Sequence, residues 1–407
     1  MKRGQLSEYF EGTAIKQLSA VEADETRSNQ HEYNATKPML SFMGRPTEPT
    51  TLPTRFVYLD NESDEPIVED AFLTLYDSRA RQPHRPAEYR FYFPTTAVSL
   101  KASPGDLLLL AKRRDEGLLV VIAACGSSAV GQIEWLFGVT GGDLSKFAVR
   151  TDEQLKNNDV GFAATAILES IGVEVTQQDD GHLEAMLKRF QGGFPSTRDF
   201  STYARETLNG VDPREGPDEA LMAWMEREET LFRILERHLI GERLAQGFDA
   251  DHVDDFIHFS LSVQNRRKSR VGLALENHIE VILSSMGIRH ARTAVTENRS
   301  KPDFLFPGRN EYHNTSFDPF RLTMLAVKST CKDRWRQVLA EADRIRSKHL
   351  LTMETSISEN QTAEMRSKHL QLVVPRGLHA TYTSVQQRWL FDLDCFTRCV
   401  LDRQRRI

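Results

Sequence analysis

The sequence predicts a multidomain α+β protein, in which a β-rich N-terminal domain precedes an α/β domain whose mixed sheet is flanked by helices. Two observations indicate this fold class. Four apolar runs of strand length, separated by Gly, Pro and charged turns, lie between residues 72 and 124. From residue 304 onward, such runs alternate with segments that have the 3.6-residue period of an amphipathic helix. The 407 residues suffice for two or three domains with separate cores.

The β-rich domain is expected over residues 1–165. Its predicted strands are 72–76, 89–93, 106–111 and 117–124. Two polar clusters in this domain are candidates for contact with DNA. One is irregular and contains Asn29 and His31, and the other is arginine-rich and contains Arg79, Arg81 and Arg90. Solvated loops are the alternative interpretation, which is the more usual one for surface arginines.

A hinge with linker helices is expected over 166–215, because turn-forming residues recur throughout this stretch. The third region, 216–407, opens with a predicted helix over 218–245. A basic run then leads into a second helix over 271–286; it consists of Arg266, Arg267, Lys268 and Arg270. From Gln264 to Lys301, eight Lys or Arg stand against three Glu, a local excess of +5 in a chain whose net charge is −6. A focused basic surface is therefore compatible with an acidic chain.

The stretch from 301 to 345 contains the residues best suited to catalysis. Asp303 precedes an apolar run at 304–306, and Lys328 ends another at 322–327. Lys332 and Asp333 then begin a predicted helix that carries Glu341. The apolar residues of that helix recur with helical period and are Trp335, Val338, Leu339, Ala342 and Ile345. Further predicted elements are strands at 349–353 and 370–374 and helices at 360–368 and 384–403.

Asp303, Lys328 and Glu341 together fit metal-assisted cleavage of a phosphodiester bond. Carboxylates can hold Mg²⁺, and a neighbouring lysine can orient the attacking water or lower its pKa. The nuclease pattern PD…(D/E)XK places an acid two residues before the lysine, and that position here is Ala326. We therefore expect Glu341 to supply the second acid. The alternative is that Asp303 caps a turn while Lys328 and Glu341 are surface charges.

Composition restricts the environment of the protein. No apolar run reaches the length of a membrane span, and the N-terminal residues lack the apolar core of a signal peptide. The four cysteines form no disulfide framework. We expect a cytoplasmic protein without a membrane partner. Cys395 and Cys399 are expected to be core thiols of the last helix rather than zinc ligands.

Four ordered blocks of sequence resemble the C-terminal catalytic domain of the EcoRII-type restriction endonucleases, in which the second acid has moved to the following helix. They are SVQNRRKSRVGLALENH (262–278), KPDFLFPGRNEYH (301–313), MLAVKSTCKDRWRQVLAEADRI (324–345) and LVVP (372–375). The resemblance implies a restriction-endonuclease-like fold of the PD-(D/E)XK superfamily over 216–407. The segment YFEGTAIKQLSA and the strand pattern of 72–124 resemble the family's N-terminal domain. That domain is a DNA-binding pseudobarrel, which binds a second copy of the site.

The resemblance also implies roles for individual residues. Mg²⁺ is the implied cofactor, bound by Asp303 and Glu341, with Lys328 assisting the attacking water. Lys332 and Tyr312 match further active-site positions of the family, where they would contact or position the scissile phosphate.

Glu276 lies at the edge of the buried stripe of the helix over 271–286, where an acid is costly unless it is paired or bound to metal. The matching glutamate of the family faces the catalytic centre, so Glu276 is a candidate third acid or a support for the site. A salt bridge to Arg267 or Arg270 is an equally good interpretation.

DNA contacts are expected on two segments. The basic run at 266–270 is suited to phosphates. Asp333, Arg334 and Arg336 begin the helix after the catalytic strand, where Arg can bind guanine and Asp can accept from cytosine. The family's flipped-base pocket would fall among Trp224, Met225, Arg227 and Glu229, but the local match is poor, and packing is the better interpretation of the first two.

The function expected from these observations is that of a Mg²⁺-dependent type II restriction endonuclease that cuts double-stranded DNA at a short C/G-rich palindrome such as CCWGG. A palindrome cut on both strands implies a homodimer. The resemblance implies autoinhibition by the N-terminal domain, relief by a second DNA site, and a cognate DNA methyltransferase as functional partner. The alternatives are a defence nuclease with another site or effector, and a DNA-binding regulator without cleavage.

Overall fold

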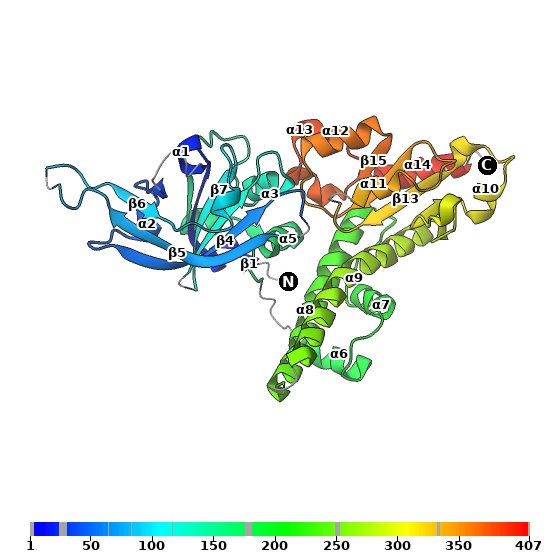
Figure 1. Ribbon diagram of the computed structural model, residues 1–407. Helices are drawn as coiled ribbons and strands as arrows, with labels where there is room; N and C mark the ends of the chain where they lie inside the picture. The colour runs from blue at the N-terminus through cyan, green and yellow to red at the C-terminus, as the bar shows by residue number, and fades with distance from the viewer. Residues whose placement is uncertain are drawn as a thin grey trace. The chain divides into compact units, whose positions relative to one another are not determined.

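The structure is a computed structural model that describes residues 4–23, 31–63, 65–82, 84–115, 117–175, 181–248, 253–331 and 334–405. It divides the chain into two compact units. Unit 1 comprises Met1–Val175 with Thr355–Asn360, and unit 2 comprises Thr176–Glu354 with Gln361–Ile407. Each unit combines a sheet with helices (Figure 1), which confirms the predicted α+β class. The pseudobarrel form, the DNA-binding role of the first unit and the domain boundaries at 165 and 215 stay predictions.

Unit 1 is built on an eight-stranded sheet. Its strands are β2 (Phe10–Gln17), β3 (Glu32–Asn34), β4 (Thr50–Leu59), β5 (Ile67–Asp77), β6 (Tyr89–Tyr92), β7 (Leu107–Arg113), β8 (Leu118–Ala123) and β9 (Ala148–Thr151). They lie in the order β3-β6-β5-β4-β8-β7-β2-β9, with β4 and β8 parallel and the other neighbours antiparallel. A separate small sheet joins β1 (Gly4–Gln5) to β10 (Asp159–Val160). The four predicted strands correspond to β5–β8, whereas β2 and β4 were not identified as strands from the sequence.

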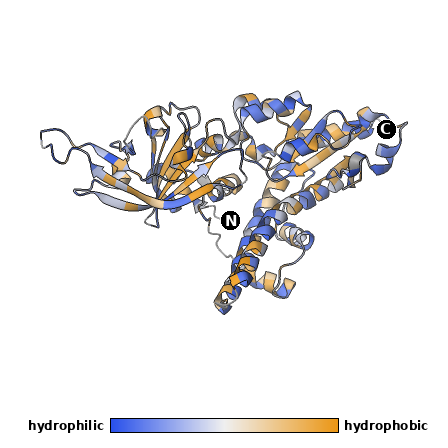
Figure 2. Cartoon of the chain, in the orientation of Figure 1, coloured by the Kyte–Doolittle hydropathy of each residue, from blue (hydrophilic) through white to orange (hydrophobic). Residues whose placement is uncertain are grey.

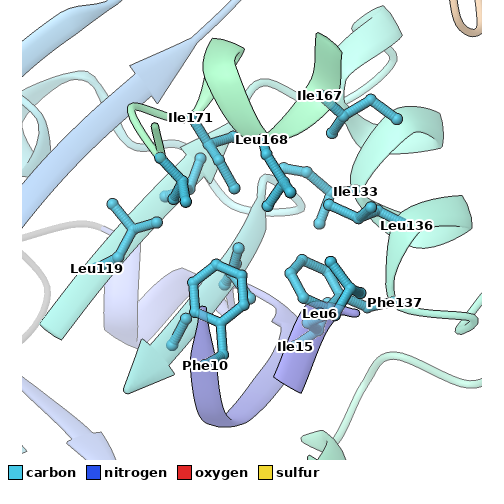
Figure 3. Packing of buried hydrophobic residues seen from close by; sticks show 14 of the residues in the cluster. Leu6, Phe10, Ile15, Leu119, Ile133, Leu136, Phe137, Ile167, Leu168 and Ile171 are labelled. Carbon is cyan, nitrogen blue, oxygen red and sulfur yellow. The ribbon is translucent and has the colours of Figure 1, made fainter. Parts of the chain in front are cut away.

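Both faces of the large sheet are covered, as the unbroken apolar run of β8 requires. Successive residues of β8 alternate between two cores: Leu119 and Val121 lie in one, and Val120 and Ile122 in the other. Figure 2 shows the apolar character of the central strands. Figure 3 shows the first core, in which side chains of the sheet meet those of α3 (Ser128–Leu136) and α5 (Phe162–Ser170). The remaining short helices of unit 1 are α1 (Ala20–Ala23), α2 (Leu40–Met43), α4 (Asp152–Leu155), η1 (Leu6–Glu8) and η2 (Ser99–Lys101).

Unit 2 contains the mixed sheet expected for the C-terminal part. Its strands are β11 (Ala291–Arg292), β12 (Phe304–Phe306), β13 (Thr323–Lys328), β14 (Lys348–Thr352) and β15 (Leu370–Val373), in that order. The first three are antiparallel neighbours, and β13, β14 and β15 are parallel. All residues of β12 and β14 are buried, which agrees with the apolar runs in the sequence.

Helices cover this sheet and extend beyond it. They are α6 (His182–Phe190), α7 (Thr197–Glu206), α8 (Pro217–Gln246), α9 (Val253–Ser285), α10 (Arg309–His313), α11 (Trp335–Val338), α12 (Glu359–Ser367), α13 (Ser384–Gln387) and α14 (Leu393–Arg405), with 3₁₀ turns η3 (Glu297–Arg299), η4 (Pro319–Arg321) and η6 (Arg376–Thr381). Figure 1 shows α8 and α9 as the longest of them. Pro217 begins α8, and Gly247, with φ of +75°, ends it. No helix in the described part of the chain is long and apolar enough to cross a membrane.

Three predicted helices differ from the observed ones. The helix expected from residue 332 is reduced to α11, because the chain turns after Val338 and Ala342 takes a φ of +50°. The helix expected over 384–403 is interrupted between α13 and α14, because Phe391 bridges to Val373 beside β15. The helix expected to begin at 271 begins at Val253, so that the basic run is itself helical.

The cysteines of the last helix were also assigned wrongly. Cys395 is exposed and Cys399 is half-buried, because the buried stripe of α14 consists of Leu393, Phe396, Thr397 and Val400. All four cysteines of the chain are free thiols, as expected.

Candidate active site

Asp303 and Lys328 meet where β12 begins and β13 ends. These strands are antiparallel, with Phe304 opposite Leu325, so the residue before β12 lies beside the end of β13. Asp303 Oδ2 accepts hydrogen bonds from the backbone N–H of Val327 at 2.7 Å and from Lys328 Nζ at 3.1 Å. One carboxylate oxygen is thereby fixed against the strand. The structure thus brings together the predicted acid and lysine.

Glu341 is the second acid of this site. It lies in the turn that follows α11, within the connection from β13 to the parallel strand β14. Its Oε2 is buried, and no donor among the described residues is within hydrogen-bond distance of it. Burial raises the pKa of the Glu341 carboxyl, as does the charge of Asp303, while the charge of Lys328 opposes that rise. The two acids and the lysine are thus electrostatically coupled.

Glu276 approaches the same group from α9. Its partner is Arg292 of β11, whose Nη2 lies 2.8 Å from Glu276 Oε2, so the salt bridge predicted to Arg267 or Arg270 is wrong. Arg292 also pairs with Glu280 at 2.9 Å. The two glutamates, four residues apart on α9, together hold the Arg292 guanidinium beside that helix. Burial raises the pKa of Glu276, and the charges of Asp303 and Lys328 act on it in opposite directions. Glu276 therefore belongs to the electrostatic surroundings of the site.

Lys348 was missed by sequence reasoning. This lysine begins β14, is buried, and donates from Nζ to the carbonyl oxygen of Leu339 at 2.6 Å. Its charge opposes the rise that burial causes in the pKa of Glu341. A lysine at the start of an apolar run resembles an ordinary strand boundary, so the sequence contained no indication of this contact.

Tyr312, which was expected to position the scissile phosphate, has a hydroxyl that contacts other protein groups, and its role toward the phosphate stays a prediction. Its side chain is 1% exposed, and its hydroxyl donates to Glu297 Oε2. Burial raises the pKa of the Tyr312 phenol, and the hydrogen bond to Glu297 adds to the rise. The hydroxyl is engaged within the protein, next to the Glu341 turn.

The DNA contacts predicted after β13 are only partly visible. Lys332 and Asp333 lie outside the described residues. Arg334 is exposed and donates to Thr330 Oγ1 at 3.3 Å. Arg336 is exposed and pairs with Glu364 at 3.0 Å. Their role in base recognition stays a prediction.

The basic run on α9 divides between two environments. Arg270 is 5% exposed, forms ion pairs with Glu228 and Glu229, and stacks on Phe232 with its guanidinium 3.9 Å from the ring centroid. Lys268 is exposed. Arg267 pairs with Glu236 at 2.7 Å. The guanidinium carbon of Arg266 lies 4.0 Å from the ring centroid of Phe194. Arg270 is thus directed into the helical core, and the exposed members remain candidates for phosphate contact.

Three of the four candidates for a flipped-base pocket are buried, and the fourth, Glu229, is half-buried. Trp224 and Met225 are 4% and 3% exposed, and Arg227 is 5% exposed. Packing therefore accounts for Trp224 and Met225 in this structure.

In unit 1, two of the predicted effector residues, Arg79 and Arg90, form ion pairs with glutamates. Arg90 lies between Glu32 and Glu88, each 2.7 Å away, and Arg79 also pairs with Glu88. Arg81 is exposed. His31 contacts the edge of Phe93, and Asn29 lies outside the described residues. The structure brings Arg79 and Arg90 together, and their contact with DNA stays a prediction.

Asp303 and Glu341 are the residues of this site that could hold a divalent metal ion. Within the described ranges, no three His, Cys, Asp or Glu side chains are placed to hold a metal together. Mg²⁺ keeps several waters and is commonly bound by one or two carboxylates with phosphate oxygens. The buried Glu341 Oε2 without a protein donor, beside Asp303, fits such a ligand pair.

Known proteins similar to this chain were found at the levels of family, sequence and structure. Residues 232–397 match the family model described as EcoRII C terminal. Over 228 residues the chain is 40% identical to the type II restriction enzyme EcoRII of Escherichia coli. That match covers 55% of this chain and 55% of the relative, so the chain spans about half the length of the curated protein it matches.

Similar solved structures include metal-depleted Ecl18kI with uncleaved, modified DNA. It has 17% identity and a TM-score of 0.46, and the match covers 57% of this chain and 86% of that one. A complex of the restriction endonuclease PspGI with substrate DNA has 16% identity and a TM-score of 0.42, over 53% and 95% of the two chains. Residues 232–397 are therefore similar to the EcoRII C-terminal domain both by family model and by sequence identity.

Proposed function

We propose that this protein is a type II restriction endonuclease of the EcoRII kind, which hydrolyses double-stranded DNA with the help of Mg²⁺. The observation that carries the proposal is the pairing of Lys328 with Asp303 at 3.1 Å, together with the buried Oε2 of Glu341, for which the described residues supply no hydrogen-bond donor. An ion pair alone would be compatible with a structural role. A second buried acid without a compensating donor is costly unless a cation is bound there.

Each residue would have a separate task. Asp303 and Glu341 would hold the metal ion. When bound, Mg²⁺ activates water and neutralises charge on phosphate oxygens. Lys328, fixed by Asp303, would orient the attacking water and contribute positive charge to the transition state. Arg334 and Arg336 on the exposed side, with Lys332 and Asp333, would contact the DNA.

The finer features of the proposal derive from the family. We propose recognition of a CCWGG-like palindrome, action as a homodimer in the cytoplasm, protection of the host site by a cognate methyltransferase, and restraint by unit 1 until a second DNA site is bound. The exposed Arg81 and the paired Arg79 and Arg90 are the candidates for that second contact. A DNA-binding regulator that does not cleave is the competing function.

Digestion of a multi-site plasmid with Mg²⁺ tests the proposal. We expect discrete fragments from the wild type and a loss of about 100-fold or more in rate for Lys328→Ala, since one preorganised charge at the reaction centre commonly contributes that much. The matched control is Lys368→Ala, because Lys368 is an exposed lysine at the end of α12. DNA binding without Mg²⁺-dependent fragments from the wild type would favour the regulator.

A further inference from the structure

Arg344 forms hydrogen bonds with the end of α10 and with the loop that follows it. The Arg344 guanidinium donates to the carbonyl oxygen of Tyr312, to that of Asn314 at 3.1 Å and to that of Phe317 at 3.0 Å. It also lies 5.6 Å from the ring centroid of Tyr312. A planar guanidinium has five N–H donors and can donate to three backbone carbonyl oxygens at once. A lysine ammonium cannot present its donors in the same fork geometry.

A carboxylate ties the same loop to the Glu341 turn. Glu297 Oε2 accepts from the Tyr312 hydroxyl and from the backbone N–H of Asp343 at 3.2 Å. Asp343 and Arg344 follow Glu341 by two and three residues. Glu297, Tyr312 and Arg344, here called the turn clamp, therefore connect three separate segments of unit 2 next to the second acid.

The Glu341 turn has a specific need for such support. The acid lies beyond the end of α11, where one turn hydrogen bond, from its backbone N–H to the carbonyl oxygen of Val338 at 3.1 Å, holds the backbone but not the side chain. The next residue, Ala342, takes a φ of +50°, a conformation that a non-glycine residue adopts at an energetic cost. The Oε2 atom of Glu341 has no hydrogen-bond donor among the described residues. Contacts made by neighbouring residues must therefore fix the position of this carboxylate.

We propose that the turn clamp positions Glu341 for binding of a divalent cation, and that Tyr312 acts through this contact instead of touching the phosphate. The proposal rests on the proposed function, because it concerns the second acid of that site. These three are positioning residues: they touch one another and the backbone around Glu341. Removing the clamp should weaken metal binding while the fold and metal-independent DNA binding persist.

The test measures Mn²⁺ binding to the full chain in the absence of DNA, by the electron paramagnetic resonance signal of unbound Mn²⁺. We expect Arg344→Met to weaken Mn²⁺ binding by about tenfold, as removal of residues that orient metal ligands commonly does. Tyr312→Phe, which removes a single hydroxyl and retains the ring, should weaken it several-fold. Arg344→Lys should lie between the wild type and Arg344→Met.

Arg403→Met is the matched control. Arg403 also donates to a backbone carbonyl, that of Leu322 at 3.2 Å, and to Thr323 Oγ1 at 2.8 Å, but at the opposite end of β13 from Lys328. It should retain wild-type Mn²⁺ affinity. Equal Mn²⁺ affinity of wild type, Arg344→Met and Tyr312→Phe would overturn the inference, and so would an equal loss in Arg403→Met, which would indicate general destabilisation.

Glu341→Gln separates this inference from the proposed function. If the wild type binds Mn²⁺ and Glu341→Gln abolishes that binding, the metal site exists, and an unaffected Arg344→Met then refutes the clamp alone. If Glu341→Gln binds Mn²⁺ as the wild type does, the metal role of Glu341 is refuted, and both proposals fall together.

Discussion

At the scale of single residues, the site combines groups that suit catalysis better than stability. Glu341 buries a carboxylate oxygen without a donor among the described residues, and burial is the largest cause of its raised pKa. A carboxyl whose pKa is higher in the folded than in the unfolded state stabilises the fold only while it is protonated. That contribution is complete below the usual pKa of 4.5 and is lost as the pH rises through the folded value.

We therefore predict that Glu341→Gln stabilises the metal-free protein at neutral pH while it abolishes cleavage. The amide removes a buried negative charge, and an unsatisfied buried group costs about 1–3 kcal/mol. For a unit of this size, that corresponds to a rise in melting temperature of roughly 2–10 °C. Thermal unfolding in EDTA at pH 7.5 and at pH 4 measures it, and the difference should shrink at pH 4. A variant less stable than the wild type at pH 7.5 would show that the carboxylate has a protein partner.

The sequence predicted Asp303, Lys328 and Glu341 as one candidate site. The structure places the first two 3.1 Å apart, and their charges act on the third, while the catalytic role of all three stays a prediction. The sequence did not identify Arg344, because this arginine acts through backbone carbonyls of a distant loop, and such acceptors leave no pattern in the sequence. Glu297 was missed for a similar reason, since it acts through a tertiary contact.

At the scale of elements, burial was easier to predict than backbone shape. Of the five residues with helical spacing, Leu339 is half-buried and the other four, Trp335, Val338, Ala342 and Ile345, are buried, although only Trp335 and Val338 lie in a helix. A short helix followed by a turn buries the same residues as a longer helix would. The positive φ of Ala342 could not be foreseen, since alanine favours helices.

Arg270 on the buried face of α9 and Lys268 on its exposed face allow a prediction that separates an effect on stability from an effect on DNA binding. Arg270→Gln should destabilise the protein by about 1–3 kcal/mol, because buried Glu228 and half-buried Glu229 lose one charged donor and retain His278 and Arg233 as partners. Lys268→Gln, two residues earlier on the exposed side, should change stability by less than about 0.5 kcal/mol. It should instead lower the slope of DNA affinity against salt by about one. Urea unfolding and binding titrations at several salt concentrations measure these effects. The reverse assignment of the two effects would show that Arg270 is the residue in contact with phosphate.

At the scale of the whole molecule, the sequence indicated two domains, 1–165 and 216–407, joined by a hinge region at 166–215, and the structure divides the chain into two units after Val175. The sequence could not indicate that Thr355–Asn360 groups with the first unit, because this segment lies far along the chain, between strands of the second sheet. Long-range grouping of this kind depends on tertiary packing, which no local pattern encodes.

If unit 1 restrains unit 2, a chain that begins at residue 176 should cut a single-site plasmid about tenfold faster than the full chain, a factor typical of coupling between sites. An added oligonucleotide that contains the recognition site should accelerate the full chain and leave the shortened chain unchanged, because only the full chain retains the second binding surface. Cleavage rates with and without the oligonucleotide measure both effects, and circular dichroism establishes that the shortened chain folds. A folded shortened chain that cuts no faster, together with a full chain indifferent to added DNA, would mean that the first unit serves a purpose other than restraint.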